Sequence, residues 1–138
     1  MSRFQEIWAP RLMSVLRIIV AFCFMQHGAQ KLLGFPIEAG ETAHTAQLMS
    51  LFGLAGIIEL GGGTLLLLGL FTRPVAFIAS GEMAFAYFMV HAKRGFWPML
   101  NHGEIVVVFC FTWLFFSVAG AGPWSLDALR GRGATPVP

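Results

Sequence analysis

Residues 48–92, LMSLFGLAGIIELGGGTLLLLGLFTRPVAFIASGEMAFAYFMVHA, contain two long apolar runs joined by a short polar turn. The first run covers residues 48–71, and the second covers residues 74–92 and begins at Pro74. Each run is long enough to cross about 30 Å of hydrocarbon as a helix that rises about 1.5 Å per residue. Proline suits the first turn of a helix, because its missing N–H has no intrahelical partner to lose. This stretch therefore predicts a tight hairpin of two membrane-spanning helices.

Two further apolar runs, residues 12–33 and 104–121, flank the hairpin. Arg17 lies inside the first of them, and no small-residue cleavage signal follows, so we expect a retained helix rather than a signal peptide. Four spans put both ends of the chain on one side, and the excess of basic residues there predicts a cytoplasmic location. The basic residues on that side are Arg3, Arg11, Arg17, Arg73, Arg130 and Arg132, against Lys31, Lys93 and Arg94 on the other. The predicted fold is all-α, a polytopic membrane four-helix bundle with cytoplasmic N and C termini.

The composition agrees with a membrane protein. Of the 138 residues, 57% are hydrophobic and only 12% are charged, against roughly 25% charged residues in an average soluble domain. We predict one membrane domain over residues 1–130, a disordered tail over residues 131–138, and a multi-pass location in a bacterial cytoplasmic membrane. The formal net charge is +2, and the basic residues are scattered, which argues against nucleic-acid binding. The expected partners are the lipid bilayer, further oxidoreductase subunits and a second copy of the chain.

Charged residues inside the predicted spans are the most informative, because each costs at least about 2.5–3.5 kcal/mol unless it is paired or hydrated. At about 1.5 Å per residue, Glu59 and Glu82 lie at nearly the same depth, and the long side chain of Arg17 reaches toward them. Small residues three positions before and four positions after each glutamate let helices approach closely there. We therefore expect Arg17, Glu59 and Glu82 to form a deep polar cluster.

A second polar layer is expected near the outer face. His27 and Lys31 lie four residues apart on one face of the first span, and Glu104 opens the fourth span. On an ideal helix His91 points roughly opposite Glu82, so we leave it out of the deep cluster. A metal site needs three or four converging ligands, and this layer brings only two or three within reach, so we predict no metal.

Both layers admit two interpretations. Intramembrane charges are typical of proton or ligand sites, yet buried ion networks also lock helices in register. Nothing in the residue pattern decides between these alternatives or assigns a catalytic residue. The candidate ligand-binding or proton-handling residues are His27, Lys31, Glu59, Glu82, Glu104 and Arg17.

Five segments recur in order along a known family. They are QHGAQKLLGF at 26–35, ELGGGTLLLLGLFTRP at 59–74, Glu82, NHGE at 101–104 and GAGPWSLDAL at 120–129. On these segments the chain resembles the DoxX family of small four-helix membrane proteins. The usual family pattern before the glutamate of the fourth span is Asn-Gly-Gly-Glu, and His102 replaces the first glycine here.

The resemblance implies a membrane subunit of the kind linked to a terminal quinol oxidase, to thiosulfate:quinone oxidoreduction and to redox defence. By position it carries over His27, Lys31, Glu59, Glu82 and Glu104, whereas depth alone adds Arg17. Our leading hypothesis is an integral membrane subunit of an oxidoreductase system that binds a quinone or a small sulfur substrate. The chain shows no cofactor signature of its own, so it is at most an accessory subunit. The alternatives are a small proton or solute transporter and a non-catalytic scaffold or assembly factor.

Overall fold

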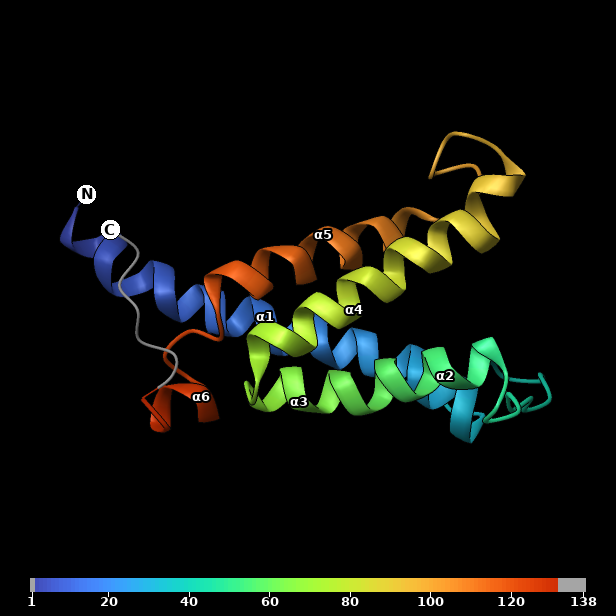
Figure 1. The fold of residues 1–138 in the computed structure, drawn as a ribbon, viewed down its shortest axis with the longest axis horizontal. Coiled ribbons are helices and arrows are strands. Elements are labelled where there is room, and N and C mark those ends of the chain that lie inside the picture. Colours follow the sequence, from blue (N-terminus) through green and yellow to red (C-terminus); the bar gives the residue numbers. More distant parts are fainter. Residues whose placement is uncertain (1, 132–138) are drawn as a thin grey trace.

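The computed structural model describes residues 2–131, which form helices joined by loops and contain no strand (Figure 1). In chain order the elements are α1 (Arg3–Leu33), α2 (Leu51–Ile57), the π-helical η1 (Ile58–Gly62), α3 (Gly63–Leu68), α4 (Thr72–Ala86), the π-helical η2 (Tyr87–His91), the 3-10 turn η3 (Ala92–Arg94), α5 (Glu104–Ala119) and α6 (Leu126–Leu129). Three continuous stretches are long and apolar enough to cross a membrane, namely Arg3–Leu33, Leu51–Leu68 and Thr72–Arg94, and α5 is a shorter apolar helix. The predicted all-helical fold is confirmed.

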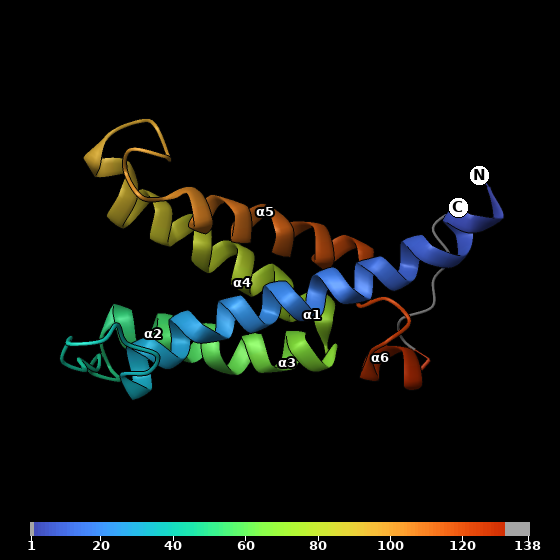
Figure 2. The same cartoon turned by 180° about the vertical axis from the view of Figure 1, so that it is seen from behind.

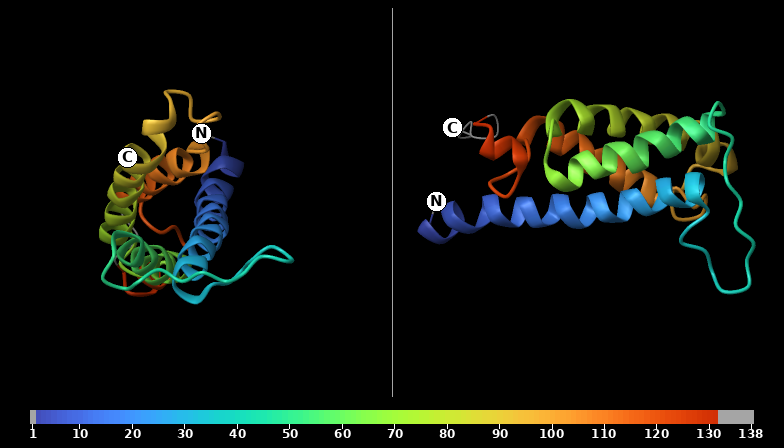
Figure 3. Two further views of the ribbon diagram at one scale, coloured as in Figure 1. Left: turned by 90° about the vertical axis from the view of Figure 1, so that its right-hand side faces the viewer. Right: turned by 90° about the horizontal axis from the view of Figure 1, so that it is seen from below.

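The helices run along one another and surround a common axis (Figures 1 and 3). Helix α1 packs along α2, η1 and α3, while α4 packs along α5; Figure 2 shows the same arrangement from behind. The start of α1 and the short α6 lie at one end, called here the α6 end, and the loops of residues 34–50 and 95–103 lie at the other, called the loop end. Both ends of the described chain are thus on one side. The predicted tail falls outside the described residues except for Gly131, and the cytoplasmic orientation stays a prediction.

Helix boundaries follow capping groups rather than hydropathy alone. Helix α1 begins at Arg3, well before the apolar run that starts at Leu12, because Ser2 forms a capping box with Gln5. The Ser2 hydroxyl accepts from the Gln5 backbone N–H, and the Gln5 side chain accepts from the Ser2 backbone N–H. Helix α3 ends at Gly69, which adopts the left-handed conformation with φ +66°. The predicted hairpin turn is confirmed between α3 and α4.

Glycines bring α1 almost into backbone contact with its neighbour. A Cβ on Gly28 would collide with backbone atoms of Gly56, Glu59 and Leu60, and one on Gly63 would lie 2.6 Å from the Cγ atom of Met25. Side chains larger than hydrogen would push the helices apart. The small residues around position 59 therefore serve the close approach that the sequence predicted, and they hold Glu59 against α1.

An aromatic core fills the middle of the molecule between α1, α4 and α5. The ring of Phe24 packs edge-on against Phe109 at 5.3 Å and against Trp113 at 5.4 Å between centroids. Phe24, Trp113 and Phe116 have no exposed surface, and Ala76 and Ala79 of α4 belong to the same core. This core separates the polar groups near the loop end from the α6 end.

Candidate functional site

The centre of the site is an ion pair between α1 and η1. The ammonium Nζ of Lys31 lies 2.5 and 2.6 Å from the two carboxylate oxygens of Glu59. Glu59 is only 2% exposed, whereas the side chain of Lys31 is 27% exposed. Lys31 stands in the last turn of α1, and Glu59 stands in the first turn of η1. The sequence placed these residues in separate layers, but the structure joins them because a lysine side chain spans the difference in depth.

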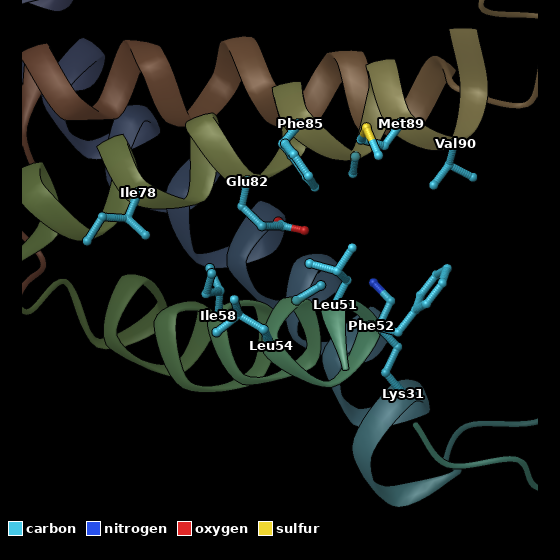
Figure 4. A pocket seen from close by; sticks show the side chains of 12 residues that line it. Lys31, Leu51, Phe52, Leu54, Ile58, Ile78, Glu82, Phe85, Met89 and Val90 are labelled. Carbon is cyan, nitrogen blue, oxygen red and sulfur yellow. The ribbon is translucent and has the colours of Figure 1, made fainter. Parts of the chain in front are cut away.

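Glu82 faces Lys31 across an apolar groove between α2 and α4 (Figure 4). The groove has a volume of about 450 Å³, and Lys31 and Glu82 are its charged lining residues. Its other walls are apolar side chains, including Phe52, Ile78 and Phe85. The Oε2 atom of Glu82 is buried and has no hydrogen-bond partner within residues 2–131. Buried polar atoms normally find partners. Among the described residues, Arg17 Nε, Thr72 Oγ1 and Trp113 Nε1 lack one as well, but of the four only Glu82 Oε2 belongs to a residue that lines the groove. We call Lys31, Glu59 and Glu82 the polar cluster.

A second cavity lies on the other side of the ion pair. This cavity, called here the histidine chamber, has a volume of about 290 Å³. Its polar lining residues are His27, His91, His102, Lys31 and Glu59, and its other walls are apolar side chains, among them Met83, Val106 and Phe109. The His27 ring stands edge-on to Phe109, with 5.6 Å between centroids. The chamber and the apolar groove share Lys31, Phe52, Ala86 and Val90 in their linings. Lys31 therefore borders both an apolar space and a space with three histidines in its wall.

His91 does not line the apolar groove with Glu82, but it lines the histidine chamber together with Glu59, which the ideal-helix argument did not foresee. Residues Tyr87–His91 form the π-helix η2 rather than a continuation of α4. A π-helix closes its hydrogen bonds over five residues instead of four, which changes the direction of every side chain in it. Glu59 also stands in a π-helical segment, η1. Hydropathy carries no signal for such segments, and π segments are frequent at functional sites.

A DoxX family model matches residues 12–92 of this chain. An uncharacterized protein of Haemophilus influenzae is 44% identical over 126 residues, which cover 88% of this chain and 92% of that protein. The chain belongs to the DoxX family. An uncharacterized membrane protein of Mycobacterium tuberculosis is 27% identical over 140 residues (91% of this chain, 85% of that protein). The inner membrane protein YqjF of Escherichia coli is 27% identical over 127 residues (86% and 91%). No solved structure matches. Together with the apolar helices, these relatives establish a multi-pass membrane protein.

In this DoxX protein Asn101 organises the loop before α5. Its side chain donates to the backbone oxygen of Gly95 at 2.8 Å and accepts from the backbone N–H of Gly103 at 2.9 Å. Its own backbone oxygen lies 3.1 Å from Nδ1 of His91. Asn101 is fully buried. Asn101 was named in the segment NHGE but received no predicted role. Its only local signal in the sequence is an asparagine two residues before a glycine.

His102 occupies a backbone position that suits glycine. Its φ is +60°, in the left-handed region that residues with a Cβ rarely adopt. A glycine at this position, which the resemblance to the family implied, would adopt that conformation without strain. The substitution also adds an imidazole to the lining of the histidine chamber.

Arg17 does not join Glu59 and Glu82, so the predicted deep cluster is wrong in this member. Its guanidinium is fully buried near the α6 end, where it donates to the backbone oxygens of Ala121 and Trp124, both at 2.7 Å. A longer bond of 3.4 Å reaches the oxygen of Leu67 near the end of α3. Carbonyls at helix ends and in loops lack intrahelical partners and attract cations. Depth along the spans identified only carboxylates as partners for Arg17, because backbone carbonyls carry no sequence signal.

Asp127 is a second structural charge at the α6 end that the sequence analysis missed. Its two carboxylate oxygens accept from the backbone N–H groups of Phe71 and Thr72, at 2.9 and 2.8 Å. These groups begin α4, so the carboxylate caps that helix and neutralises its positive dipole end. Asp127 lies far along the chain from the start of α4, so no local N-cap sequence pattern predicts this contact.

Glu104 lies apart from the residues with which it was grouped. It is exposed in the first turn of α5, beside Trp97, Pro98 and Leu100 rather than in the histidine chamber. A carboxylate in a first turn favours the helix dipole. Of the predicted outer layer, only His27 and Lys31 come together. Within residues 2–131, no three His, Cys, Asp or Glu side chains are placed to hold a metal ion.

Proposed function

We propose that this chain is an integral membrane subunit of an oxidoreductase system in the bacterial cytoplasmic membrane, and that it binds a quinone-type amphiphile in the apolar groove. The observation that carries the proposal is the orphaned Oε2 of Glu82, which faces Lys31 at the polar end of an otherwise apolar groove. Binding sites for small molecules typically combine apolar walls with a few convergent polar groups and occupy about 300–1,000 Å³. The groove, at about 450 Å³, lies within that range.

The chemistry of the polar cluster suits a ring that carries oxygen atoms. A ring carbonyl accepts hydrogen bonds, and the Lys31 ammonium has three donors, of which Glu59 uses two. A ring hydroxyl donates, and Glu82 offers an acceptor without a partner. The cluster is therefore suited to hold both the oxidised and the reduced head group. Electrons would come from a partner subunit, because the chain carries no cofactor signature.

A small sulfur substrate is the other candidate ligand of the cluster. It would use Lys31 and Glu82 but not the apolar walls. A narrower groove therefore distinguishes the two ligands. Ala55→Leu adds bulk to the α2 wall of the groove, so it should weaken the binding of an amphiphile and leave the binding of a small polar ligand unchanged. Transport and scaffolding make different predictions. Transport predicts solute or proton flux in vesicles that contain this chain alone, whereas a scaffold predicts a stable partner on purification.

The test is thermal unfolding of the detergent-purified protein with and without a short-chain, water-soluble quinone. A ligand at about 100 times its Kd adds about 2.7 kcal/mol to the folded state. We expect this stabilisation in the wild type and in Glu104→Gln, the matched control whose carboxylate lies outside the groove. We expect it to be lost in Glu82→Gln and Ala55→Leu. The absence of a shift in the wild type would contradict the proposal, and equal shifts in all four proteins would place the ligand elsewhere.

A further inference from the structure

Three histidines in the lining of the histidine chamber have ring nitrogens without a hydrogen-bond partner within residues 2–131. Nδ1 of His91 contacts the backbone oxygen of Asn101, and because a carbonyl oxygen only accepts, Nδ1 carries the proton. Nε2 of a neutral His91 is then a free acceptor. Neither His27 nor His102 forms a hydrogen bond within residues 2–131. A buried water needs two to four polar partners and enough room. The five polar side chains that stand among the apolar walls of the chamber offer such partners, and at about 30 Å³ per water molecule the chamber has room for several.

A polar path continues from the ion pair to the loop end. Lys31 also lines a third cavity of about 520 Å³ beneath the loop of residues 34–50, with Gln30, Thr42 and His44 among its polar walls. Lys31 thus borders all three cavities at this end. The chamber itself reaches His102 in the exposed loop before α5. Polar lining residues are therefore found from the ion pair out to the exposed loops at this end.

The opposite direction is closed. The fully buried core residues Phe24, Trp113 and Phe116 lie between the polar cluster and the α6 end. Beyond them the fully buried Arg17 guanidinium ties the end of α3 to the segment before α6. The cavity at the α6 end, lined by Thr72, Gly120 and Asp127 among others, shares no lining residue with the three cavities around Lys31.

We propose that the histidine chamber is a water-filled access route that connects the Lys31–Glu59 pair to the loop end alone. It admits protons and small hydrophilic solutes, whereas an amphiphile reaches the same pair through the apolar groove. The inference rests on the proposed function in treating the polar cluster as a ligand site. Its test uses no quinone, so the two proposals fail independently.

The first test is thiol labelling in vesicles with a membrane-impermeant, permanently charged methanethiosulfonate. A reactive thiol displaces methanesulfinate and forms a mixed disulfide with the reagent. The background carries Cys23→Ala and Cys110→Ser, and the exposed positions Glu38→Cys and Arg130→Cys report the loop end and the α6 end. We expect His91→Cys and His102→Cys to be labelled from the same side as Glu38→Cys. The thiol of Ser80→Cys, at a position only 6% exposed, should react at least about tenfold more slowly from either side, because it needs local opening.

Two labelling results would overturn the inference. Failure of His91→Cys to react from the loop end, while His102→Cys reacts, would show that the chamber is dry. Equal labelling of His91→Cys from both sides, or labelling of Ser80→Cys from the side of Arg130→Cys, would show a path past Arg17.

The second test needs no substitution near the chamber. In radiolytic footprinting of the wild-type protein, water beside a side chain generates hydroxyl radicals that oxidise it. Met83 is 3% exposed but lines the chamber, whereas Trp113 is fully buried in the dry core. We expect oxidation of Met83 and protection of Trp113. An unmodified Met83 would contradict a water-filled chamber even if every cysteine variant failed to fold.

Discussion

The two ends of this molecule treat buried charge in opposite ways. At the α6 end Arg17 is fully buried and donates to three backbone oxygens, although its Nε has no partner within residues 2–131. Asp127 accepts from two backbone N–H groups there and also lines the cavity at that end. At the loop end the Lys31–Glu59 pair stands beside open cavities, and Glu82 leaves an oxygen without a partner. Charges whose hydrogen bonds go to the backbone fasten the fold, whereas a charged group that faces a groove without a partner is available to a ligand. The comparison assigns structure to one end and binding to the other.

Removal of Arg17 should have the largest effect on stability. Arg17→Ala leaves the oxygens of Ala121 and Trp124 buried without donors, and hydrogen bonds to charged groups are worth about 1.5–3 kcal/mol each. We expect a loss of about 4 kcal/mol, measured by denaturant unfolding in detergent. Arg17→Lys should recover only part of it, because one ammonium cannot reproduce the planar fork. A small loss of unfolding free energy in Arg17→Ala would contradict the structural role of Arg17 at the α6 end.

Glu59 at the loop end should show energetic coupling with Lys31 and none with Arg17. Lys31→Met leaves Glu59 buried without a cation and should cost about 3 kcal/mol, and adding Glu59→Leu should recover most of it. The combination of Arg17→Met with Glu59→Leu should be additive, because those side chains do not meet. A double-mutant cycle on unfolding free energies measures both terms. Coupling to Arg17 instead would restore the cluster predicted from depth.

The cap at the start of α4 should contribute less. Asp127→Asn keeps one side-chain acceptor for the N–H groups of Phe71 and Thr72 but loses the second and the charge. We expect a loss of about 1 kcal/mol, in the usual range for helix caps. Glu104→Gln, an exposed first-turn carboxylate, serves as the control and should lose about 0.5 kcal/mol or less. Similar losses in the two variants would show that Asp127 acts only through the helix dipole.

The smallest effect on stability is expected at His102. His102→Gly relieves the positive φ, which costs residues with a Cβ about 1 kcal/mol or more, but it also increases the freedom of the unfolded chain. We expect a net gain between 0 and about 1 kcal/mol in thermal unfolding. His102→Ala, which keeps the Cβ and removes only the ring, should show no such gain. A clear loss in His102→Gly would mean that the imidazole itself holds the loop.

Part of the candidate site was predictable from the sequence. Glu59, Glu82, His27 and Lys31 were identified because a polar residue in an apolar span is visible without tertiary information. Their partners were not, since depth along a helix fixes neither the reach of a lysine nor the identity of the group across from it. His91 was set aside because an ideal helix points it away from Glu82, and no sequence signal shows that it lines a chamber with Glu59. Asn101 and Asp127 act on backbone groups, which every residue carries and no sequence pattern marks.

The sequence by itself determined the helical class, the long spans and the hairpin between α3 and α4. Each of these depends on local properties: apolar length, the absence of a backbone donor in Pro74 and the conformational freedom of Gly69. Only the tertiary structure decided that Arg17 fastens the α6 end, that Lys31 pairs with Glu59, and that three histidines share a chamber. Those facts depend on which backbone carbonyls stay unpaired and where packing leaves space. Both follow from the way several helices meet.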